Sequence, residues 1–141
     1  MADILVLYHS RNGATEAMAR EVCTGVDSVD GMSARLRTVP DVSATTAAVE
    51  AAVPASGPPY ASNTDLDECA GIIMGSPSNF GNMAAPLKHF LDNTVGEWLR
   101  GALVGKPAGT FASTGSLHGG QETTLLTMAC LLYTSDAADE E

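Results

Sequence analysis

Short apolar runs that end in polar, glycine-containing loops recur along this chain, and a helix-like segment follows most of these loops. Residues 3–8 form the first run, and apolar side chains then recur at a spacing of three and four from 14 to 26. The predicted strands are 3–8, 32–39, 71–75 and 106–112, and the predicted helices are 14–26, 84–94 and 121–132. Parallel strands joined by helices need crossover connections, so we predict an α/β fold with a doubly wound, mostly parallel sheet.

The length of 141 residues suits one compact domain, which we place at residues 1–132. Residues 40–63 are rich in Ala, Pro, Ser and Gly without a clear period, so we expect an insertion or long loop there. A single helical turn is expected at 66–70, just beyond this region. Residues 133–141 form a polar, acidic tail that we expect to lie outside the fold.

The charge balance excludes several classes of function. The formal net charge is -10, and the seven Lys and Arg side chains are scattered singly, so we expect no nucleic-acid partner. No apolar run approaches the roughly 20 residues of a membrane span, and the start of the chain lacks the basic residues of a signal peptide, so we expect a cytoplasmic protein without membrane insertion. The three cysteines form no CxxC pair, which disfavours a disulfide framework or a zinc site.

Three loops at the expected carboxyl ends of strands carry the candidate chemistry, because open α/β sheets bind ligands at this edge. Residues 10–15 precede a helix N-terminus, which favours an anion such as a phosphate. Residues 76–82 and 113–120 are rich in Ser, Asn and Gly, as expected of a wall for a planar, hydrogen-bonding ring. The same residue types also form ordinary helix caps and turns, Phe80 could be a core residue, and His118 could be a plain surface residue.

Specific motifs lie in and around these loops: LYHSRNGATEAMAR at 7–20, GSPSNFGNM at 75–83, FLD at 90–92, Trp98, STG at 113–115 and GGQET at 119–123. Together they resemble the WrbA family of flavodoxin-like NAD(P)H:quinone oxidoreductases. The likeness covers residues 2–128 and implies a flavodoxin-like sheet of order 2-1-3-4-5. A counterpart of the fifth strand is missing after residue 132, so we expect a sheet that stops at the fourth strand.

The resemblance implies a binding site for FMN, in which the residues divide by role. Its phosphate group would be held by Ser10, Arg11, Asn12, Gly13, Ala14 and Thr15. One side of its ring would be held by Ser78, Asn79 and Phe80, and the other side by Ser113, Thr114, Gly115, Ser116, Leu117 and His118. Trp98 would line the substrate pocket, although an indole at this position could also belong to the core or an interface. Asn12 stands where an aromatic residue near the nicotinamide is common in the family.

The implied activity is two-electron reduction of quinones with NAD(P)H as the electron donor, and it demands no acid or base from the protein because FMN carries the chemistry. The family also implies a homotetramer whose flavin sites are completed by neighbouring subunits. Two alternatives stay open at this point. The chain could be an FMN-binding electron carrier or flavin-binding regulatory module without turnover of its own, or a truncated fragment without function.

Overall fold

The computed structural model describes residues 1–42 and 54–134 and confirms the alternation of strands and helices. The strands are β1 (Ala2–Tyr8), β2 (Met32–Thr38), β3 (Gly71–Pro77) and β4 (Ala108–Ser113). The helices are α1 (Ala14–Asp27), α2 (Asn63–Glu68), α3 (Ala85–Asp92), α4 (Val95–Leu99) and α5 (Gln121–Thr134). The four strands form one sheet in the order β2-β1-β3-β4, and every neighbouring pair is parallel. The α/β class and the order of the first four strands are as predicted.

The parallel register brings the carboxyl ends of all four strands to one edge of the sheet. Tyr8 lies beside Thr38 at the end of β1 and β2, and Pro77 lies beside Ser113 at the end of β3 and β4. Three of the loops that leave this edge, after β1, β3 and β4, are the polar loops in which the sequence places the candidate chemistry. Residues that are about a hundred positions apart in the sequence therefore meet in space.

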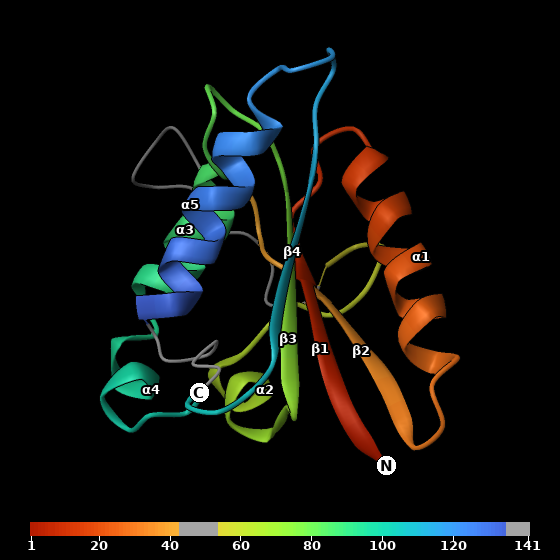
Figure 1. Ribbon diagram of the computed structural model, residues 1–141, viewed down its shortest axis with the longest axis vertical. Helices are drawn as coiled ribbons and strands as arrows, with labels where there is room; N and C mark the ends of the chain where they lie inside the picture. Colours follow the sequence, from red (N-terminus) through yellow and green to blue (C-terminus); the bar gives the residue numbers. More distant parts are fainter. Residues whose placement is uncertain (43–53, 135–141) are drawn as a thin grey trace.

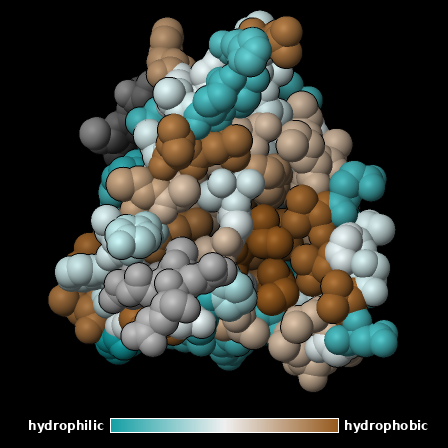
Figure 2. Space-filling model, in the orientation of Figure 1, coloured by the Kyte–Doolittle hydropathy of each residue, from teal (hydrophilic) through white to brown (hydrophobic). Residues whose placement is uncertain are grey.

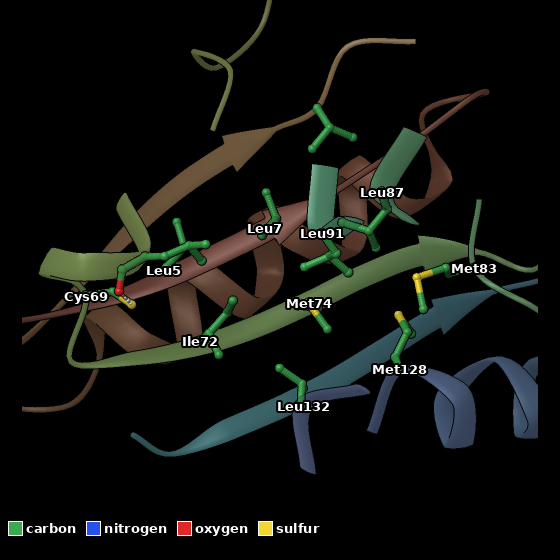
Figure 3. Close-up of a cluster of buried hydrophobic side chains, with 12 residues drawn as sticks. Leu5, Leu7, Cys69, Ile72, Met74, Met83, Leu87, Leu91, Met128 and Leu132 are labelled. Atoms are coloured by element: carbon green, nitrogen blue, oxygen red, sulfur yellow. Dashed lines mark hydrogen bonds between the residues drawn. The ribbon is translucent and has the colours of Figure 1, made fainter. Parts of the chain in front are cut away.

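Helices cover both faces of the sheet, with α1 on one side and α3 and α5 on the other (Figure 1). The larger core lies under α3 and α5, and Figure 3 shows its side chains reaching from both layers. The sheet contributes Leu5, Leu7, Ile72 and Met74, all without exposed surface, and the helices contribute Leu87, Leu91, Met128 and Leu132. Successive residues of a strand point to opposite faces, which is why Val6 and Tyr8 pack instead against Ala19 of α1.

On the α1 side of the sheet, an apolar hollow of about 340 Å³ remains open beside the early part of the strands. Its lining includes Ile4, Val29, Ile73 and Pro107. Figure 2 shows hydrophobic side chains gathered on the face of the molecule seen in Figure 1. On the α1 side of the sheet, the ring of Phe111 packs so closely on β3 that a Cβ atom added to Gly75 would lie 2.0 Å from the ring.

Some boundaries differ from the predicted ones, and local hydrogen bonds explain the largest difference. The predicted helix 84–94 ends two residues early, at Asp92, as α3, because the Asn93 side chain donates to His89 O at 2.7 Å and the Thr94 hydroxyl donates to Leu91 O at 2.8 Å. A separate short helix that was not predicted, α4, follows from Val95. The predicted strand 106–112 begins only at Ala108, since Pro107 has no N–H for the sheet.

The predicted loop at 40–63 belongs only in part to the described residues, because residues 43–53 lie outside them. Tyr60 forms an isolated parallel bridge with Thr38 of β2, and Ala61 N–H donates to Thr38 O at 2.8 Å. The helical turn expected at 66–70 begins earlier, as α2, where Ser62 and Asp65 form a reciprocal capping box. Helix α5 continues to Thr134, two residues past the predicted boundary at 132, and the rest of the acidic tail lies outside the described residues.

Candidate functional site

A cavity of about 640 Å³ opens at the carboxyl edge of the sheet, and all three predicted loops contribute to its wall. Ten of the residues that the sequence analysis singled out line it: Ser10, Arg11, Asn12, Ala14, Thr15, Ser78, Asn79, Ser113, Thr114 and Gly115. The sequence analysis missed its remaining lining residues, among them His9, Asp41 and Pro86. The only signal for His9 was its place as the first polar residue after β1, and nothing in the sequence brings Asp41 to this edge.

The N-terminus of α1 meets this cavity without a capping side chain. Gly13 is the N-cap residue, with a φ of +85° that a residue with a side chain rarely adopts, and no side chain among the described residues caps the backbone N–H groups of the first turn. The first N–H groups of a helix have no partner inside it, and the helix dipole favours negative charge at this end. Ser10 Oγ accepts a hydrogen bond from Gly13 N–H at 3.1 Å, which shapes the loop. This end of α1 is thus suited to bind an anion.

Arg11 adds a positive charge to the same wall. Of the seven Lys and Arg side chains, the others are engaged: Arg20 with Glu16, Arg35 with Asp3, Arg37 with Asp65, Arg100 with Asp67, Lys88 with Asp92, and Lys106 with the carbonyl oxygens of Leu66 and Asp67. Within residues 1–42 and 54–134, Arg11 has no such partner, and its side chain lines the cavity. A cation without a partner among the described residues, beside the uncapped end of α1 in an acidic protein, is a second reason to expect an anionic ligand.

His9 and Asp41 lie close to each other in the wall of the cavity. The Nε2 atom of His9 lies 3.6 Å from Asp41 Oδ1, and His9 is only 5% exposed whereas the side chain of Asp41 is largely exposed. Burial lowers the pKa of His9 below its ordinary value, and Arg11 acts in the same direction, while Asp41 opposes them. His9 is therefore neutral at pH 7 and contributes polarity rather than charge to the cavity.

Two short contacts tie the three loops together. The hydroxyl groups of Thr15 and Ser113 lie 2.9 Å apart, which joins the start of α1 to the end of β4. The backbone N–H of Ser78 donates to Ser113 O, also at 2.9 Å. Behind them, Ser76 Oγ, which has no exposed surface, accepts a hydrogen bond from Ala84 N–H at 2.8 Å and so positions the start of α3. The polar groups of the wall are held in place by the protein itself.

The remaining predicted cofactor residues do not line the cavity. They are Gly13, Phe80, Ser116, Leu117 and His118. Phe80 is fully exposed, so the interpretation of Phe80 as a core residue is wrong, and its φ of +52° is unusual for a residue with a side chain. His118 has the same φ, and its Nδ1 atom lies 2.5 Å from Glu122 Oε1, a hydrogen bond that lowers the pKa of Glu122.

Trp98 lies in a different place from the one its predicted role requires within a single chain. It lines a separate cavity of about 270 Å³ together with Leu91, Val95 and Thr134. Its indole Nε1–H donates to Thr134 O at 3.0 Å, and the residue is 57% exposed. Trp98 is therefore no part of the buried core, and it could meet the large cavity only if that cavity belonged to another copy of the chain.

Among residues 1–42 and 54–134, no three His, Cys, Asp or Glu side chains are grouped as a metal site would require. In the same part of the chain, no helix combines the length and the apolar character that crossing a bilayer requires.

Comparison with known proteins places this fold and site in context. The family described as NADPH-dependent FMN reductase matches residues 2–137. Two curated relatives named NAD(P)H dehydrogenase (quinone) are 43% identical over 129 residues, from Solidesulfovibrio magneticus, and 44% identical over 135 residues, from Acidithiobacillus ferrooxidans. The matches cover 88% and 94% of this chain but 64% and 67% of the relatives, so the chain spans about two thirds of their length.

Solved structures confirm the flavodoxin-like fold. A flavodoxin, WrbA-like protein from Agrobacterium tumefaciens superposes with a TM-score of 0.74 at 25% identity, over 96% of this chain and 74% of that one. An archaeal flavodoxin and flavodoxin 2 from Bacillus cereus superpose with TM-scores of 0.70 and 0.69, each over 99% of this chain and over 78% and 80% of their own chains. At 21% and 20% identity, these two similarities concern the fold alone.

Proposed function

Because the chain belongs to the NADPH-dependent FMN reductase family, we propose that it binds FMN in the cavity at the carboxyl edge and reduces a quinone at the expense of NAD(P)H. The observation that carries this proposal is the anion site, where the uncapped N-terminus of α1 meets Arg11, a cation without a partner in residues 1–42 and 54–134. A flavin with a terminal phosphate group matches a cavity that has such a site at one part of its wall and hydroxyl and amide groups elsewhere. The names of the two curated relatives agree with this activity.

The residues present fit this cofactor in a definite arrangement. The backbone N–H groups at 14–16, the Ser10 hydroxyl and the Arg11 guanidinium would hold the phosphate group. Ser78, Asn79 and the 113–115 segment would bind the polyol and the ring, since they offer hydroxyl, amide and backbone groups from two neighbouring strands. The chemistry that this group supplies when bound is two-electron transfer between a hydride donor and an acceptor. The protein would contribute position and exclusion of water.

One observation favours a second candidate function. Trp98 is absent from the cavity of the single chain, so no indole is available there to stack on a flat quinone. A chain that acts alone would then serve as an FMN-binding electron carrier. Quinone reduction would instead need an assembly such as the homotetramer that the family resemblance implies, in which a neighbouring chain supplies Trp98. The cytoplasmic location remains a prediction from the sequence.

Purification and turnover separate these functions. We expect a yellow protein that retains FMN and oxidises NADPH or NADH only when benzoquinone is present. A yellow protein without turnover would favour the electron carrier, and a chain that binds no FMN even on addition would refute both.

A charge placed at the helix end tests the anion site itself. Ala14 is exposed and lines the cavity, so Ala14→Glu puts a carboxylate where the phosphate group is proposed to bind without disturbing the core. We expect this variant to lose FMN. Ala17→Glu is the matched control, because Ala17 is exposed on the next turn of α1 and does not line the cavity. Equal FMN retention by the two variants would contradict the assignment.

A further inference from the structure

We propose that Thr124 is a positioning residue that makes Ser78 a pure hydrogen-bond acceptor toward the cofactor, an inference that rests on the proposed binding of FMN. Ser78 lines the cavity, whereas Thr124 lies behind it on α5 and has no exposed surface. The two hydroxyl oxygens are 2.7 Å apart and 46 residues apart in the chain. The sequence analysis singled out Ser78 and not Thr124.

The direction of this hydrogen bond follows from the other contact of Thr124. Its hydroxyl donates to the carbonyl oxygen of Gly120 at 2.9 Å, and a hydroxyl has a single proton to donate. Thr124 must therefore accept the proton of Ser78. The hydroxyl proton of Ser78 is thus committed to the protein, and its backbone N–H is committed to Ser113 O at 2.9 Å. The Ser78 side chain can therefore accept a hydrogen bond from a ligand but cannot donate one.

The backbone around Gly120 holds the two partners at this distance. A Cβ atom on Gly120 would lie 2.9 Å from Gly81 Cα and 3.2 Å from Ser78 Oγ, so only glycine lets the start of α5 approach the loop after β3 this closely. Gly120 also has a φ of +95°. The position of the Ser78 hydroxyl is consequently fixed by α5 as well as by the loop after β3 in which Ser78 lies.

An acceptor at this place selects one kind of ligand group. A phosphate group, which is ionised, has no proton to offer Ser78, so the partner is a donor: the imide N–H of the flavin ring or a hydroxyl of the ribityl chain. Loss of the Thr124 hydroxyl would free the proton of Ser78 and leave its hydroxyl to rotate, which weakens binding of either donor.

The test measures the FMN dissociation constant of the full chain by quenching of flavin fluorescence, together with the Tm of the ligand-free protein. For Thr124→Val we expect roughly three- to tenfold weaker binding, as for loss of one hydrogen bond. Thr124→Ser keeps the hydroxyl and should bind FMN like the wild type. Ser78→Ala should weaken binding as much as Thr124→Val, and the double variant no further, because Thr124 acts through Ser78. Thr127→Val is the control, since its hydroxyl, one turn further along α5, contacts Asn82 outside the cavity wall and its loss should leave affinity unchanged.

Several results would overturn the inference. A Thr124→Val variant with lowered Tm and wild-type affinity would show a merely structural role, and additive losses in the double variant would show that Thr124 does not act through Ser78. If Thr124→Val does not fold, unchanged affinity in Ser78→Ala or lost affinity in Thr124→Ser refutes it equally. A wild-type chain that binds no FMN would refute the proposed function and this inference with it. Binding of N3-methylated FMN distinguishes the two possible donors. If Thr124→Val no longer weakens binding of this analogue, the donor is the imide N–H; if it still weakens binding, the donor is a ribityl hydroxyl. Either result supports the acceptor role of Ser78.

Discussion

Removal of the hydrogen bond between the Thr15 and Ser113 hydroxyl groups should destabilise the protein. Thr15 is 1% exposed, and the Ser113 hydroxyl at 2.9 Å is the one partner of its side chain among the described residues. Ser113→Ala therefore leaves a buried hydroxyl unpaired, which costs about 1 to 3 kcal/mol. For a domain of this size that loss corresponds to a decrease in Tm of roughly 3 to 12 °C. Thermal unfolding of the ligand-free protein, followed by circular dichroism, measures it.

A double-mutant cycle isolates the pair from the rest of the loop. Thr15→Val keeps the shape of the buried side chain and removes the hydroxyl, so in the Ser113→Ala background it should recover about half or more of the lost stability, since removal of both partners is nearly neutral. Ser116→Ala, an exposed serine in the same loop, is the control and should melt with the wild type. Additive losses in the Thr15 and Ser113 variants would refute the reasoning, because they would mean that the two hydroxyls do not depend on each other.

Three further predictions concern residues around the site and the sheet. Burial lowers the pKa of His9, so the unfolded chain binds a proton at His9 more readily than the folded protein, and stability should fall as the pH drops below about 6.5. In urea unfolding between about pH 7 and pH 5, His9→Gln should reduce this dependence of the unfolding free energy on pH. An unchanged pH dependence in the variant would exclude His9 as its source. Gly75→Ala should destabilise the folded protein by more than about 2 kcal/mol, because the added Cβ would overlap the ring of Phe111. Gly25→Ala is the control, since Gly25 has open space around it in α1, and it should stabilise the protein by about 0.5 to 1 kcal/mol. Similar changes in Tm for both variants would argue against the overlap. Trp98→Ala should lower the unfolding free energy by much less than the roughly 3 to 5 kcal/mol that loss of a core indole costs. A raised KM for the quinone in this variant would support the role of Trp98 as a substrate-binding residue that one chain supplies to the cavity of another. A large loss of stability with unchanged KM would refute that role.

The amino-acid sequence by itself was enough to predict the order of strands and helices and the edge at which the polar loops meet. Both follow from local rules: apolar runs and helical spacing depend on neighbours a few positions away, and parallel crossovers bring every strand end to the same edge. Four strands in the order β2-β1-β3-β4 and ten predicted residues around one cavity are the result. The end of α3 at Asp92, two residues before the predicted boundary, escaped prediction because the Asn93 and Thr94 side chains compete with the backbone for its own hydrogen-bonding groups.

Only the tertiary structure decided which side chains face one another across the site. Thr124, which lies just outside the 119–123 motif, packs behind Ser78, and Trp98, which the sequence pointed to, lines a separate cavity. Only the folded chain shows that Arg11 has no partner in the part of the chain that the structure describes, because the other cations pair with carboxylates and carbonyl oxygens, several of them about thirty residues away. Such pairings depend on how the layers pack and on distances of a few tenths of an ångström, and no local pattern encodes these.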